Sequence, residues 1–76
     1  MPVFNYTVDG EPQETSAHSL TPTQILTNAG IDATNHYLVE VKGKHQESFR
    51  DKAETPIHID QHMQFVSVFV GSMTVS

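Results

Sequence analysis

The chain has 76 residues and a mass of 8.5 kDa, so it is long enough for one small domain and too short for two. Nine acidic side chains against four basic ones give a formal net charge of −5, which argues against a protein that binds the phosphate backbone of nucleic acids. The absence of cysteine excludes disulfides, thiolate metal ligands and thiol nucleophiles.

The first predicted element is a β-hairpin. Apolar and polar residues alternate over residues 4–8, which is the period-2 pattern of a half-buried strand. Asp9-Gly10 is a strong signal for the turn, because glycine tolerates positive φ and aspartate bonds its own backbone. Pro12 has no backbone N–H, so we expect the return strand, over residues 13–19, at an edge of a sheet.

A single short helix is predicted next. Thr21 can cap its first turn, Pro22 suits the first helical position, and Gln24 can complete a capping box. Apolar side chains among residues 25–29 form one stripe, and Gly30 provides a left-handed C-terminal stop. A helix of about nine residues is marginal on its own, so we expect this one to be stabilised by packing on a sheet.

Further strands are predicted in the second half of the chain. Residues 36–41 form one strand, a tight turn at 42–44 leads to a short strand over 46–49, and residues 56–59 form either a brief strand or one helical turn. The last strand, over residues 63–70, is the most apolar segment of the chain. The order ββαβββ, with one helix on one face of a mixed sheet, is that of an α+β fold.

The order, the length and the lack of cysteine resemble the ubiquitin-like β-grasp fold. More closely, the chain is similar to the bacterial multi-ubiquitin family, in which ubiquitin-like domains are encoded beside ubiquitination-type enzymes. The segments that carry the resemblance are Tyr6 to Gly10, Leu20 to Leu26 with Ala29-Gly30, Tyr37 to Glu40, and Phe65 to Gly71. The resemblance implies a β-grasp domain over residues 1–70 and a flexible C-terminal tail over residues 71–76.

The resemblance also implies a protein modifier that is joined to its targets through a C-terminal glycine. Ubiquitin ends in a Gly-Gly pair, whereas here Gly71 alone is followed by five residues that begin with Ser72. The chain would then be a precursor that a peptidase processes after Gly71, before activating and conjugating enzymes attach the Gly71 carboxylate to target proteins. From the residues alone, Gly71 is explained more simply as the end of a strand.

A partner surface is expected on the last strand, because both of its faces are mostly apolar and a single helix covers only one face of a sheet. We expect Val66, Val68 and Val70 to pack inward, which leaves Phe65 and Phe69 on the outer face as partner-binding residues. The simpler alternative is a central strand whose outer face is shielded by long neighbouring side chains. The alternative function is a non-conjugated β-grasp interaction module that binds proteins or copies of itself.

The chain has three lysines, which are Lys42, Lys44 and Lys52. The simplest interpretation is that they are solvent-exposed charges of turns and loops. A second interpretation, which rests on the resemblance to a modifier, is that one of them accepts the carboxyl end of another copy and so builds chains.

Metal binding and catalysis are not expected. His58 and His62 are four residues apart and would share one face of a helix, but the isoleucines on both sides of His58 favour extended backbone. None of the six serines lies in a nucleophile elbow, and no glycine-rich phosphate-binding loop occurs, so we predict neither an enzyme nor a cofactor. Because no run of about 18 apolar residues and no signal-peptide pattern is present, we expect a cytoplasmic protein without a membrane partner.

Overall fold

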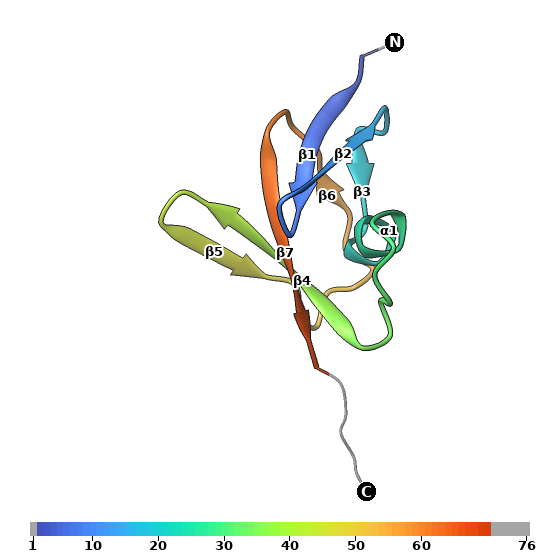
Figure 1. Ribbon diagram of the computed structural model, residues 1–76, viewed down its shortest axis with the longest axis vertical. Helices are drawn as coiled ribbons and strands as arrows, with labels where there is room; N and C mark the ends of the chain where they lie inside the picture. Colours follow the sequence, from blue (N-terminus) through green and yellow to red (C-terminus); the bar gives the residue numbers. More distant parts are fainter. Residues whose placement is uncertain (1, 71–76) are drawn as a thin grey trace, which may run out of the picture.

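Five strands form a mixed sheet in the computed structural model, which describes residues 2–70 (Figure 1). Their spatial order is β2 (Glu11–Thr15), β1 (Phe4–Val8), β7 (Met63–Phe69), β4 (His36–Lys42) and β5 (His45–Ser48). Two short strands, β3 (Ser19–Leu20) and β6 (Ile57–His58), pair with each other outside this sheet. β7 is central, parallel to β1 and antiparallel to β4. The predicted α+β class is confirmed, and the arrangement is compatible with a β-grasp.

The first hairpin follows its turn residues. Asp9 and Gly10 have φ angles of 54° and 82°, the left-handed region that this kind of two-residue turn requires. Pro12 lies on β2 and pairs with Thr7 of β1. β2 is an edge strand, as predicted. The return strand begins two residues earlier than predicted and ends at Thr15, because the chain after it leaves the sheet and pairs as β3 with β6.

Helix α1 (Pro22–Asn28) begins with the predicted capping box. Thr21 Oγ1 accepts a hydrogen bond from the Gln24 backbone N–H at 3.2 Å, and Gln24 Oε1 accepts one from the Thr21 backbone N–H at 2.9 Å. The helix has only seven residues, so its stability depends on burial of Ile25 and Leu26, which are almost completely shielded from solvent.

The core lies between α1 and one face of the sheet. Its buried members are Tyr6, Val8, Leu20, Ile25, Leu26, Leu38, Phe49, Ile57, Ile59 and Phe65. Ile57 and Ile59 point inward while His58 between them is exposed, so residues 56–59 are extended and the alternative of a helical turn does not occur.

The facing of β7 is opposite to the prediction. Phe65 is only 1% exposed and its ring makes an edge contact with Tyr6, with the ring centroids 5.9 Å apart. Phe65 lies opposite Val8, and residues opposite each other in adjacent strands share a face, so Phe65 belongs to the core. Val66 and Val68 therefore lie on the outer face. The predictions that Phe65 binds partners and that these valines pack inward are wrong.

Phe69 shares the face of Phe65 but not its burial. It is 63% exposed, because it lies past the end of β1, and its nearest aromatic contact is the His36 ring at 5.3 Å between centroids. Gly71, Ser72 and the rest of the predicted tail over residues 71–76 lie outside the described residues. Within residues 2–70, no helix is both long enough and apolar enough to cross a membrane.

Candidate functional site at the end of the central strand

The first boundary of the candidate site is the start of β4, beside the last described residues of the chain. The Val70 backbone N–H donates to the Asn35 carbonyl at 2.8 Å, one residue beyond the last pair of the β4–β7 ladder. Before Asn35 the backbone turns, and the Asp32 carboxylate fixes this turn by accepting hydrogen bonds from the Thr34 backbone N–H at 2.9 Å and hydroxyl at 2.6 Å. This turn therefore leads into the start of β4, and the Asn35 carbonyl within it holds Val70 in place.

The second boundary is the place where β1 stops. The Asp9 backbone N–H donates to the Phe65 carbonyl at 2.9 Å, and the Asp9 carboxylate accepts hydrogen bonds from the Ser67 backbone N–H at 2.8 Å and hydroxyl at 2.5 Å. Gly10 then turns the chain away into the hairpin. The described part of β7 is therefore held by Asp9 at Ser67 on one side and by Asn35 at Val70 on the other.

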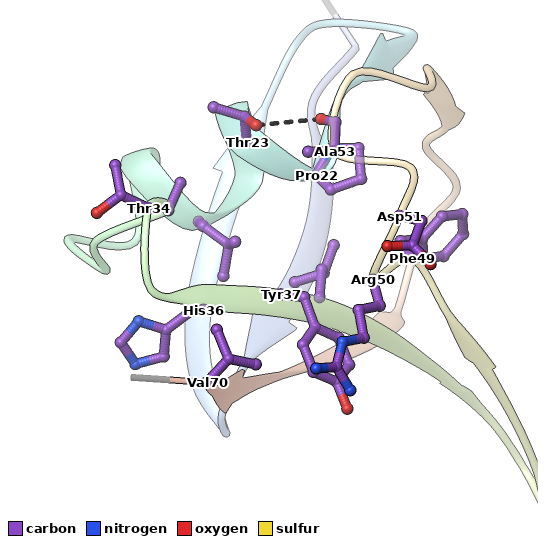
Figure 2. Close-up of a pocket in the computed structure, with 13 residues that line it drawn as sticks. Pro22, Thr23, Thr34, His36, Tyr37, Phe49, Arg50, Asp51, Ala53 and Val70 are labelled. Carbon is purple, nitrogen blue, oxygen red and sulfur yellow. Dashed lines mark hydrogen bonds between the residues drawn. The ribbon is translucent and has the colours of Figure 1, made fainter. Parts of the chain in front are cut away.

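A cavity of about 230 Å³ lies beside this strand end (Figure 2). Its apolar wall includes Leu26, Leu38, Phe49 and Val70. The loop on its far side is fixed to α1, because Thr23 donates from its backbone N–H and its hydroxyl to the Ala53 carbonyl, at 3.2 Å and 3.1 Å. The cavity beside Val70 therefore has a wall that two hydrogen bonds hold in place.

Arg50 lines the same cavity and is the only arginine of the chain. Its guanidinium carbon lies 5.3 Å from the centre of the Tyr37 ring, within the range of a cation–π contact. This contact places a fixed positive charge near the strand end of an otherwise acidic protein.

The outer face of the sheet carries an apolar strip that we call the outer valine face. Its members are Tyr37, Val39, Val41, Val66 and Val68. Val39 pairs with Val66 and Tyr37 with Val68, so the side chains form adjacent cross-strand pairs. Val39 is buried and the others are half-buried, while α1 packs on the opposite face.

The residues of β7 predicted for this face are the wrong ones, although the sequence holds one signal for the right ones. The alternation of Tyr37, Val39 and Val41 along β4 marks an apolar outer row next to β7. Pairing that row with Val66 and Val68 gives the observed face, but this requires the strand register, which depends on contacts far apart in the chain.

The three lysines do not form a cluster. Lys42 Nζ lies 3.2 Å from Glu47 Oε1, and this hydrogen bond holds the pKa of Lys42 above its ordinary value. Lys44 follows the turn at Gly43, and Lys52 lies in the loop before β6, with both side chains exposed. All three lysine side chains are thus accessible to solvent. That one of them accepts the carboxyl end of another copy stays a prediction.

The histidine pair is separated in the structure. His58 Nε2 lies 3.2 Å from Asp60 Oδ1 on the surface, whereas His62 stands in a left-handed turn whose backbone N–H donates to the Asn5 carbonyl. In the part of the chain that the structure describes, no three histidine, aspartate or glutamate side chains are grouped so that they could hold a metal ion.

Comparisons with known proteins give no match: no protein-family model, no curated protein and no solved structure matches this chain. A functional assignment therefore depends on the geometry of the strand end and the outer valine face, together with the resemblance noted in the sequence.

Proposed function

We propose that the chain is a ubiquitin-like protein modifier with a β-grasp fold, made in the cytoplasm as a precursor and processed after Gly71. Activating and conjugating enzymes would then join the Gly71 carboxylate to target proteins. The observation that carries this proposal is that the central strand β7 is held by Asp9 at Ser67 and by Asn35 at Val70, the residue before Gly71. The partner enzymes would supply the catalysis, and the modifier itself would need no cofactor.

The strand end supports this proposal for a physical reason. A peptidase or an activating enzyme must approach the backbone closely, and a glycine without Cβ allows that approach. The hydrogen bonds from Val70 to Asn35 and from Ser67 to Asp9 hold the strand in place up to the residue before this glycine. A partner that recognises the folded domain would therefore find the strand in a fixed position up to Val70, the residue before the reacting glycine.

The outer valine face supports the proposal as a docking surface. Four of its five side chains are only half-buried, and α1 covers the other side of the sheet. A contiguous apolar strip of this kind on a small acidic protein is typical of a partner-binding surface. The exposed Phe69 adds an apolar group close to the strand end.

Intact-mass measurement tests the modifier proposal. A chain with an N-terminal tag, expressed in its own host, should lose residues 72–76 and appear in higher-mass adducts that contain a target protein. Gly71→Val should abolish both products, because the added side chain blocks close approach to the backbone, and it should leave the thermal unfolding temperature unchanged. Ser76→Val is the matched control in the same segment and should still be processed. Persistence of the full 76-residue chain without adducts would show that the proposal is wrong.

The second candidate is a non-conjugated interaction module, which the outer valine face favours. Val66→Ser combined with Val68→Ser should abolish partner association, because the two residues lie side by side with Tyr37 and Val39. Two results together would favour the module. The variant would have lost its association with partners, and no covalent adduct of the native chain would be found in its host. Thr7→Ser, on the same face of β1, is a conservative control that should leave association unchanged.

A further inference from the structure

The core-facing side of β4 holds a buried carboxylate that receives no hydrogen bond. Glu40 is 6% exposed and lies opposite Phe65, so its side chain is on the face of the sheet that carries the core. The nearest cationic atom is Lys42 Nζ at 3.8 Å, which is beyond hydrogen-bond distance. Among the described residues, none donates a hydrogen bond to the Glu40 carboxylate.

Glu40 lies against a cavity of about 420 Å³ between the β4–β5 hairpin and the segment that contains β6, which we call the Glu40 cavity. Its apolar lining consists of Phe49, Pro56, Ile57 and Met63. Its polar lining consists of Glu40, Lys42, Glu47, Thr55, His58 and Asp60. The cavity therefore combines an apolar wall with three carboxylates.

The electrostatics of the Glu40 cavity favour a cation. Burial raises the pKa of Glu40, and the nearby Glu47 and Asp60 charges raise it further, while Lys42 opposes them. Glu47 lies directly opposite Glu40 on β5, an arrangement of like charges that costs free energy; the Lys42 ammonium offsets this cost more at Glu47, 3.2 Å away, than at Glu40, 3.8 Å away. A buried carboxylate without a donor carries a desolvation penalty that a bound cation would offset.

The lining indicates which cation fits. Because no three ligating side chains are grouped for a metal ion in residues 2–70, a metal would lack a preformed site. The apolar wall suits methylene groups, and Lys42 shows that an ammonium is accepted at the rim, 3.2 Å from Glu47. We propose that the Glu40 cavity binds a primary ammonium on an aliphatic stem, with Glu40 as its anionic partner and Phe49 and Met63 packed against the stem.

Lys42 is the internal competitor for this site. Its side chain is 54% exposed, donates a hydrogen bond to Glu47 at 3.2 Å and forms a longer ion pair with Glu40 at 3.8 Å, so it lies at the rim between the two carboxylates. Lys42→Met removes this competing ammonium and should tighten binding of an external ammonium. Lys44→Met, in the same hairpin but outside the cavity lining, is the matched control and should leave binding unchanged.

NMR titration of the full chain with n-butylammonium chloride tests the proposal, with potassium chloride at equal ionic strength and 1-butanol as controls. Amide shifts of Glu40, Phe49 and Met63 should saturate with butylammonium only. Glu40→Gln should weaken binding about tenfold or more, since it removes the buried charge. Glu14→Gln, an exposed carboxylate on β2, should have no effect, and a thermal melt of each variant establishes that it is folded.

Two further titrations distinguish the sources of such an ammonium. Cadaverine represents a free aliphatic diamine, and acetyl-Ala-Lys-Ala-amide represents a lysine side chain of a partner protein; the tighter ligand identifies the source. No saturable shift in either the native chain or Lys42→Met, or equal binding by Glu40→Gln, would overturn the proposal. A saturable response to calcium chloride, with no saturable response to butylammonium, would also overturn the proposal. These measurements use the isolated chain, so their outcome is independent of whether Gly71 is conjugated.

Discussion

At the scale of single residues, Asp9 stabilises both the turn between β1 and β2 and the C-terminal part of β7. Its backbone adopts the positive φ of the hairpin turn, which aspartate tolerates better than most residues, and its carboxylate accepts both hydrogen bonds from Ser67. A side chain in a turn between β1 and β2 thereby fixes the C-terminal part of β7. Without it, the Ser67 backbone N–H would have no strand partner on that side, because β1 has already ended.

Removal of the Asp9 carboxylate should therefore be costly for an exposed residue. We expect Asp9→Ala to lower the free energy of unfolding by about 1–2 kcal/mol, since two hydrogen bonds to a charged acceptor are lost. Urea denaturation measures the change. Glu14→Ala, at an exposed position on β2, is the control and should change the free energy by less than about 0.5 kcal/mol. Equal stability of the two variants would contradict a stabilising role for the Asp9–Ser67 contact.

Glu40 predicts a pH dependence of stability. Its pKa is raised in the folded protein, mainly by burial, so the charged form opposes folding. This penalty is fully present above the folded pKa, decreases as the pH falls through it, and is gone below the ordinary value of 4.5. We expect Glu40→Gln to stabilise the protein by about 1 kcal/mol at neutral pH.

The gain from Glu40→Gln should disappear in acid, which thermal melts between neutral pH and pH 4 would show. A stability difference that is constant across this range, or a loss of stability at neutral pH, would contradict the assigned desolvation penalty. Glu47→Gln, with an exposed carboxyl group opposite Glu40, is the control for the simple loss of one negative charge on the hairpin.

At the scale of secondary-structure elements, β7 combines two environments along one face. Phe65 lies in the core under α1, and Phe69, four residues later, is exposed beyond the end of β1. Phe65→Ala should therefore lower the free energy of unfolding by about 3–5 kcal/mol, whereas Phe69→Ala should lower it by less than about 1 kcal/mol. Urea midpoints give the comparison, and Phe65→Leu provides a measurable variant if Phe65→Ala does not fold. Similar costs for the two alanine variants would contradict the observed facing of β7.

The elements differ in how far local sequence predicts them. Helix α1 was predictable, because Thr21 and Gln24 form a capping box and Pro22 lies between them at the start of the helix. The facing of β7 was not, because valines and phenylalanines alternate and either set can face inward by hydrophobicity alone. The choice depends on pairing with Val8, 57 positions away in the chain, and on the space beneath α1.

The candidate site was predictable only in part for the same reason. Gly71 stands out in sequence, since it follows the most apolar strand, but the hydrogen bonds that hold the strand before it come from Asp9 and Asn35. Glu40 gives no signal in sequence, because an alternating strand with one glutamate usually places it in solvent. Its burial follows from the register with Phe65.

At the scale of the whole molecule, negative charge and the apolar strip are found on different parts of the surface. The formal net charge is −5, three carboxylates line the Glu40 cavity, and the outer valine face carries no ionised side chain. The only arginine lies over Tyr37 at the margin of that face. Long-range attraction would therefore bring basic partners to the domain, and apolar contact on the sheet would hold them.

The parallel pairing of β1 and β7 has a mechanical consequence. Because the two strands run in the same direction, the start of β1 and the end of β7 lie at opposite ends of the sheet (Figure 1). Tension applied between them would load the β1–β7 hydrogen bonds in shear, all together and not one after another. A motor that pulls on one end of the chain would have to break them in a single event, so this small domain should resist forced extraction more strongly than its modest size suggests.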